Sequence, residues 1–336
     1  PIALSEDKTY NKDNLRAFVK EGSTVVPGCS TLSFDRISEA RVLRSIDAES
    51  FSGAKLLKDE YKNLRQMLGR IPSLKDFDEN GSVDPLLILG KYGSYHAFLQ
   101  KYECGYHTSL STTQTQMLSY VSQKLASGKR SIDLVLLEQI ILHRSVNRNE
   151  LSATFAPQSV TSAISMLTNR FTLTAQRKSF DRCLFVEEKD GEVIATRSFL
   201  EALRDDEFKR QLLEVIAFGI GRNQRDYENT YRDTNLVLFR KYTLEDVCML
   251  LNWNHNEIPL NVGGYKFDEE TNTFPVFINY DKDPRISETI KYEDRFVSDR
   301  KLIAISKQPR TLDSPEIKRL ANYNENGMKA YLFVRK

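Results

Sequence analysis

The sequence predicts a multidomain α+β protein, and three observations lead to this fold class. At 336 residues, the chain is longer than a single hydrophobic core usually organises. Apolar residues recur at helical spacing over most of the first 250 residues, whereas alternating apolar residues near the C-terminus indicate strands. A composition of 40% hydrophobic and 28% charged residues is ordinary for domains that fold without metals or disulfides.

Changes of pattern divide the chain into five expected parts. Residues 1–55 form a connector, with helices expected near Asn11–Lys20 and Ser38–Asp47. The other parts are a small helical, helix-turn-helix-like unit at 56–108, a mixed domain at 109–200, a helical linker at 201–240 and a β-rich domain at 241–336. The start lacks methionine and the end resembles a strand, so we interpret the chain as a piece of a longer protein with a truncated last domain.

The small helical unit carries periodic apolar residues and capping signals. Its first helix places apolar side chains at helical spacing, at Leu57, Tyr61, Leu64 and Leu68. Gly69 ends that helix, and Ser73 with Asp76 three residues later forms a capping box that starts the next one.

The mixed domain at 109–200 combines helices with a hairpin. A helix starts near Ser111, and a second one, Ile132–Leu142, is apolar almost all round and therefore central. The following helices are expected at Glu150–Phe155 and Gln158–Arg170. An Asp-Gly turn at 190–191 then joins two short strands. Three helices followed by a hairpin are typical of a winged helix, so this domain is expected to be winged-helix-like.

Alternating residues indicate the strands of the last domain. Phe274, Val276, Ile278 and Tyr280 alternate as in a half-buried strand, and Leu260–Phe267 is its expected hairpin partner. Further elements are expected at Lys301–Ser306 (strand), Ser314–Tyr323 (helix) and Met328–Val334 (strand). The last strand needs a partner, which an earlier strand or chain beyond the end would supply. We expect this domain to be barrel-like.

Charge is unevenly distributed along the chain. The net charge is only +2, but residues 120–186 contain nine basic and four acidic side chains, about +5 in total. The basic ones are Lys124, Lys129, Arg130, Arg144, Arg148, Arg170, Arg177, Lys178 and Arg182. Such a stretch indicates either a polyanionic partner or an ordinary solvated basic surface.

Cysteine spacing and hydropathy exclude several protein classes. The four cysteines lie far apart and form no Cys-x-x-Cys pair, so we expect no disulfide framework and no metal site. No apolar run approaches the ~20 residues of a membrane span, and there is no signal peptide. We therefore expect a cytoplasmic location and no membrane partner.

Motifs of catalysis are missing from the sequence. Gly128-Lys129-Arg130-Ser131 comes nearest to a phosphate-binding loop, but it lacks the upstream glycine and follows a helix. No paired histidines, nucleophile elbow or small-molecule site is evident, so no cofactor is expected in this chain. Asp181, Glu187 and Lys189 superficially fit a nuclease metal site, although the expected hairpin tip would fix Lys189 too loosely.

A candidate DNA-binding surface lies on the helix Gln158–Arg170. Its apolar face is opposed by short hydrogen-bonding side chains and one cation, a pattern that allows close approach to a DNA groove. These residues are Gln158, Ser159, Thr161, Ser162, Ser165, Asn169 and Arg170, and Arg177, Lys178 and Arg182 are candidates for phosphate contacts. The alternative is a polar helix packed against a neighbouring domain. The hairpin tip at 187–192 is acidic and would repel phosphate.

A second cluster of basic and aromatic side chains follows in the chain. Five cations surround Tyr227 and Tyr231, namely Arg222, Arg225, Arg232, Arg240 and Lys241. Such a cluster can bind single strands by stacking, although tyrosines at this spacing more often pack a pair of helices.

Several short motifs are spread over about residues 10–336. They are Val26-Pro27-Gly28-Cys29, Phe34-Asp35-Arg36-Ile37-Ser38, Leu68-Gly69-Arg70-Ile71-Pro72-Ser73, Gly128-Lys129-Arg130, Pro275-Val276-Phe277-Ile278, Tyr292-Glu293-Asp294-Arg295-Phe296 and Thr311-Leu312-Asp313-Ser314-Pro315-Glu316. With these motifs the chain resembles the C-terminal domain of unknown function of bacterial superfamily-2 DEAD/DEAH-box helicases, which often carry an N-terminal phospholipase-D-like nuclease. Arg70-Ile71-Pro72-Ser73 and Tyr92-Gly93-Ser94-Tyr95 are also similar to a DNA-binding helical repeat of homing endonucleases.

The resemblance implies an ATP-dependent DNA helicase or translocase in phage defence or DNA processing. ATP and Mg would belong to its motor domains, whose residues are not in this chain. Three hypotheses follow. The chain positions DNA for the motor domains of the same polypeptide, or it is a structural module that docks on the motor or on a partner protein, or it is a cryptic nuclease.

Overall fold

The computed structural model describes residues 53–258, 262, 264–279, 295–298, 301–303, 310–323 and 325–335. The connector helices expected at Asn11–Lys20 and Ser38–Asp47 therefore lie outside the described residues. The chain divides into two compact units, 1–127 with 202–221, and 128–201 with 222–336. This division differs from the five expected parts, because the helix that starts near Ser111 belongs to the first unit.

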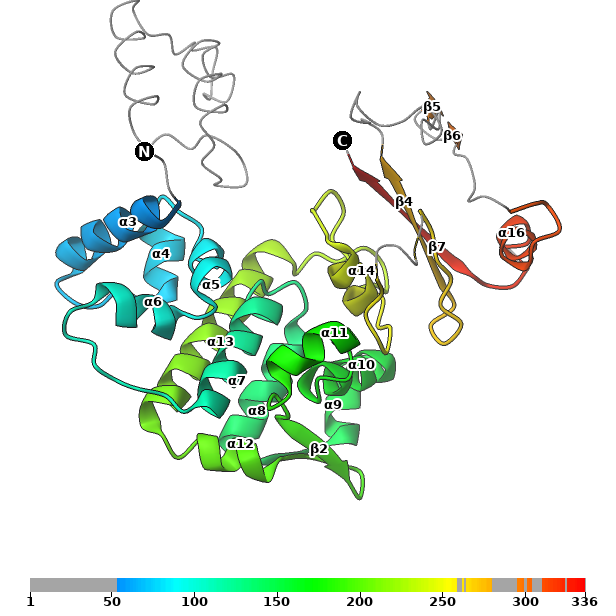
Figure 1. The fold of residues 1–336 in the computed structure, drawn as a ribbon. Helices are drawn as coiled ribbons and strands as arrows, with labels where there is room; N and C mark the ends of the chain where they lie inside the picture. Colours follow the sequence, from blue (N-terminus) through cyan, green and yellow to red (C-terminus); the bar gives the residue numbers. More distant parts are fainter. Residues whose placement is uncertain are drawn as a thin grey trace, which may run out of the picture. The chain divides into compact units, whose positions relative to one another are not determined.

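The first unit is helical in its described part (Figure 1). Its helices are α3 (Gly53–Leu68), α4 (Leu74–Asn80), α5 (Leu86–Tyr92), α6 (Tyr95–Tyr102), α7 (Thr112–Lys124) and most of α13 (Asp206–Asp226). The expected capping box of Ser73 with Asp76 is present, and a second one joins Ser111 with Gln114. In each box the two side chains satisfy backbone N–H groups that the first helical turn leaves without partners.

A polar network joins α6, α13 and the chain between α6 and α7. The Tyr106 hydroxyl donates to Glu207 and lies 2.7 Å from Nδ1 of buried His96. Arg210 donates to both oxygens of Glu207, at 2.6 and 2.8 Å. Burial alone would raise the pKa of Glu207. The hydrogen bonds from Arg210 and Tyr106 outweigh that effect and lower it to about 2.

We predict that Glu207 gives the first unit an acid-sensitive part of its stability. A carboxyl group whose pKa is lower in the folded state stabilises that state above its ordinary pKa of 4.5, and this contribution is lost as the pH falls towards 2. Glu207→Gln should cost about 1–2 kcal/mol at pH 7, after allowance for screening by solvent. Urea unfolding of both proteins from pH 7 to pH 2 should show the difference shrinking below pH 4.5. A difference independent of pH would contradict the prediction.

The second unit begins with the central helix α8 (Ser131–His143) and continues as helices with a small sheet. In chain order it contains β1 (Ser145–Asn147), α9 (Arg148–Thr154), α10 (Pro157–Leu167), α11 (Thr174–Arg177), a 3-10 turn (Lys178–Phe180), β2 (Val186–Lys189), β3 (Glu192–Ala195) and α12 (Arg197–Ala202) (Figure 1). The strands form an antiparallel sheet in the order β1-β3-β2. Leu134, Leu137 and Ile140 of α8 are fully buried, which confirms its expected central place.

The hairpin between β2 and β3 has the expected two-residue turn. Asp190 and Gly191 both have positive φ, 51° and 81°. This is the backbone conformation in which an Asp-Gly pair joins strands with their natural twist. The short strand β1, which pairs with β3, was not predicted.

The rest of the second unit contains α14 (Leu244–Leu250), β4 (Thr273–Asn279), β5 (Arg295–Ser298), β6 (Lys301–Ile303), α16 (Pro315–Ala321) and β7 (Lys329–Arg335). The last strand finds its partner in β4, with which it pairs in parallel. The expected hairpin partner of β4 contributes only isolated antiparallel bridges, Tyr265 to Val276 and Asp268 to Thr273. The expectation of a barrel is wrong for the described residues. The strands of this region form two separate two-stranded sheets, β4 with β7 and β5 with β6, and neither sheet closes into a barrel.

No helix in the described ranges is both long and apolar enough to cross a membrane.

Candidate nucleic-acid interface

The ten residues predicted to contact DNA lie on α10 and on the segment that follows it. The structure separates them by exposure. Ser159, Ser162, Ser165 and Asn169 are buried. Gln158, Thr161, Arg170, Arg177, Lys178 and Arg182 are exposed. The polar face of the helix is therefore only partly open to a ligand.

The segment after α14 covers the middle of this polar face. Ser162 Oγ donates to the carbonyl of Trp253, and Ser165 Oγ donates to that of Asn254, at 3.4 and 2.9 Å. Asn169 donates to the carbonyl of Phe180 at 2.7 Å. These side chains satisfy backbone carbonyl groups of the same unit, so the middle of α10 is packed against the protein.

The exposed start of α10 is joined to the acidic hairpin. Arg148 of α9 donates to Oγ1 of Thr161 at 2.6 Å and forms an ion pair with Glu188 of β2. One carboxylate of the hairpin is thus neutralised by a cation next to α10. The repulsion of phosphate by the acidic hairpin is correspondingly weaker at this end of the helix than the sequence indicates.

The cations after α10 have different roles. Arg177 donates to the carbonyl groups of Thr172 and Arg170, at 2.9 and 2.5 Å, so it holds the turn after the helix. Arg170 and Lys178 are exposed and have no hydrogen-bond or ion-pair partner among the described residues. Because their charges are not satisfied by the protein, these two are the better candidates for contacts with phosphate.

Two of the nine basic residues counted in the sequence, Arg130 and Lys129, form largely buried ion pairs. Arg130 is 4% exposed and donates to both oxygens of Asp133, at 2.6 and 2.7 Å. Lys129 pairs with Asp246 of α14 at 2.5 Å. A count of charges along the sequence cannot reveal this burial, because a lysine or arginine in a buried ion pair is the same residue type as one on the surface.

Arg130 also links distant parts of the chain. Its Nη1 donates to Ser162 Oγ at 2.8 Å and to the carbonyl of Met249 at 2.7 Å. Nothing in the sequence indicates this role beyond a basic residue before a helix. The guanidinium thus joins α8, α10 and the end of α14 at one buried point.

The nuclease hypothesis finds no support in this geometry. Within the ranges that the structure describes, which include Asp181 and Glu187, no three histidine, cysteine, aspartate or glutamate residues gather as metal ligands would.

A family model described as a domain of unknown function, DUF8090, matches residues 57–228, which is 172 of the 336 residues. The chain belongs to the DUF8090 family. A second domain of unknown function, DUF3427, matches residues 236–336. No curated protein matches the chain. The bonds from Arg130, Ser162 and Ser165 to residues 249–254 join the DUF8090 region to the DUF3427 region within one compact unit.

Proposed function

We propose that this chain binds DNA as an accessory region, through the exposed start of α10 and the segment after the helix. The order of α8, β1, α9, α10 and the β2–β3 hairpin supports a winged-helix assignment, in which α10 takes the place of the recognition helix. The resemblance extends this proposal to an ATP-dependent helicase whose motor domains the chain supplies with DNA.

Two exposed cations after α10 are the main support for this proposal. Arg170 and Lys178 are exposed cations without a protein partner in the described part of the chain, and they lie just after α10, where Arg177 and Arg182 are also exposed. Buried Ser162 and Ser165 cannot read bases in this conformation. Binding through phosphate contacts, with little sequence preference, is therefore the mode that the geometry favours.

We predict that Arg170→Ala combined with Lys178→Ala weakens binding of a 20-base-pair duplex about tenfold at low salt. The slope of log K against log salt should fall by about 1.8, because two phosphate contacts are lost. Fluorescence anisotropy over a salt series measures both quantities.

A matched control removes the same charge elsewhere. Lys62 and Arg204 are also exposed, and Lys62→Ala with Arg204→Ala should leave the affinity and the slope nearly unchanged. Equal losses in the two double variants would show that net charge alone governs binding, and the proposed interface would then be wrong.

A further inference from the structure

The loop that leads into α14 carries two adjacent apolar residues that are exposed to solvent. The side chain of Phe239 is 100% exposed and that of Leu238 is 54% exposed. Phe239 also has a φ of +64°, in the left-handed region that bulky side chains rarely adopt. Exposure and backbone strain at the same phenylalanine are unfavourable for folding, so they indicate a residue kept for contact with a ligand.

The surroundings of this loop are basic and aromatic. Arg240, the next residue, places its guanidinium 5.6 Å from the ring centre of Tyr227 and forms an ion pair with Asp226 at 3.4 Å. Arg232 lies 5.0 Å from the ring centre of Tyr231. Protein interfaces usually centre on larger apolar patches from which charges are depleted. An exposed ring next to a cation in the chain, preceded by a further cation and tyrosine pair, instead matches the stacked bases and phosphates of a single strand.

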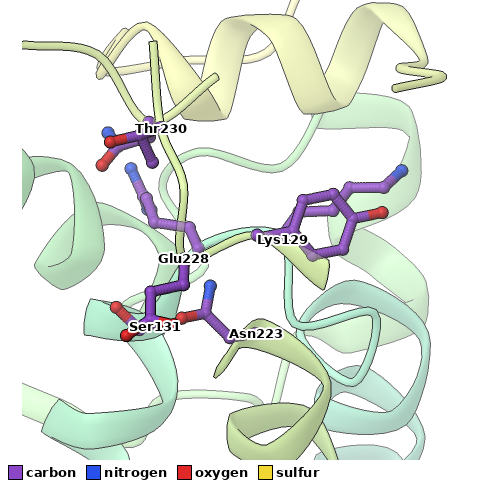
Figure 2. A pocket seen from close by; sticks show the side chains of 8 residues that line it. Lys129, Ser131, Asn223, Glu228 and Thr230 are labelled. Atoms are coloured by element: carbon purple, nitrogen blue, oxygen red, sulfur yellow. The ribbon is translucent and has the colours of Figure 1, made fainter. Parts of the chain in front are cut away.

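A pocket of about 230 Å³ lies beside the same tyrosine (Figure 2). It is lined by Lys129, Arg130, Ser131, Asn223, Tyr227, Glu228, Thr230 and Asn235. Lys129 and Arg130 are already paired with Asp246 and Asp133. The side chains of Glu228 and Thr230 have no hydrogen bond within the described residues and are open to a ligand. The volume is below that of sites for drug-sized molecules and suits a single ring system.

We propose that this loop and pocket bind unpaired bases of single-stranded DNA. Phe239 stacks on one base, and Arg232 faces the phosphates. A neighbouring base enters the pocket against Tyr227, where the Glu228 carboxylate accepts a hydrogen bond from an exocyclic amino group. Cytosine carries such a group and thymine does not, so the site prefers cytosine. This inference rests on the proposed DNA binding and assigns it a second, single-stranded substrate.

The test compares labelled 12-mers of dC and dT by anisotropy on the whole chain. The wild type should bind dC at least threefold more tightly than dT. Phe239→Ala should weaken binding of both about tenfold, because a stacked base is lost. Glu228→Ala should bring the dC-to-dT ratio to one. The matched control is Leu312→Ala, since Leu312 is another exposed apolar side chain and should leave both affinities unchanged.

Folding does not confuse the outcome, because Phe239 is fully exposed, and thermal melts should show no loss of stability in Phe239→Ala. Unchanged single-strand binding in Phe239→Ala would overturn the inference. Binding of the duplex by wild type and its loss in the Arg170 and Lys178 variant are measured separately. A failure of this inference can therefore be distinguished from a failure of the proposed function.

Discussion

Replacing Arg130 with alanine is expected to lower the free energy of unfolding of the second unit by about 3–5 kcal/mol. Its side chain is 1% exposed and holds the equally buried Asp133 by two hydrogen bonds. Without the guanidinium, this carboxylate stays in the interior with no cation. Ser162 and the carbonyl of Met249 also lose their donor.

Urea unfolding followed by fluorescence can measure this loss. The chain has a single tryptophan, Trp253, which is 1% exposed and reports on the second unit. The matched control is the double variant Arg130→Met with Asp133→Leu, which removes both charges and should recover most of the loss. If Arg130→Ala were as stable as the wild type, the guanidinium would not be the buried link between α8, α10 and α14.

Local patterns were sufficient for most helices and for the hairpin turn. The Ser73 and Ser111 capping boxes and the Asp190-Gly191 turn depend on residues no more than three positions apart. The sequence therefore contains everything that decides them. The three-residue strand β1 was missed because its length is too short to show any alternation.

The candidate interface could be predicted only in part, because its cover comes from far along the chain. Ser162 and Ser165 look like open polar residues until Trp253 and Asn254, about 90 positions later, place their carbonyl groups against them. A short hydroxyl side chain serves a DNA groove and a backbone carbonyl equally well, so residue type does not distinguish the two. The pairing of strands could not be predicted for the same reason. Alternating apolar residues indicate which face of β4 is buried, but they do not show that its parallel partner is β7, far along the chain.

Phe239 could not be singled out from the sequence, because neither its exposure nor its backbone conformation can be read from residue type. Leu238 and Phe239 before two cations would ordinarily be read as the edge of a core. Only the structure shows that both are exposed and that the backbone at Phe239 is left-handed. The basic and aromatic pattern of the sequence is compatible with stacking of bases on Tyr227 and Tyr231, but both side chains are half-buried. Phe239 supplies the fully exposed ring that such stacking needs.

Replacing Trp253 with alanine is the second change expected to be severe, at about 3–5 kcal/mol. The indole is buried, its Nε1 donates to Thr273 Oγ1 at 2.8 Å, and its own carbonyl covers Ser162. Loss of the ring leaves a cavity under the segment that joins the DUF3427 region to α10. Circular dichroism during urea unfolding measures the loss, since the fluorescent reporter is removed.

Trp253→Phe provides the control, because it keeps a large ring and loses the hydrogen bond to Thr273. It should cost about 1–2 kcal/mol. Hydrogen exchange adds a local readout. Amides of α10 should exchange faster in Trp253→Ala than in Trp253→Phe, because the cover over Ser162 and Ser165 is loosened. Equal protection of α10 in both variants would mean that the segment after α14 does not hold this helix, and its polar face would then be open to DNA along its whole length.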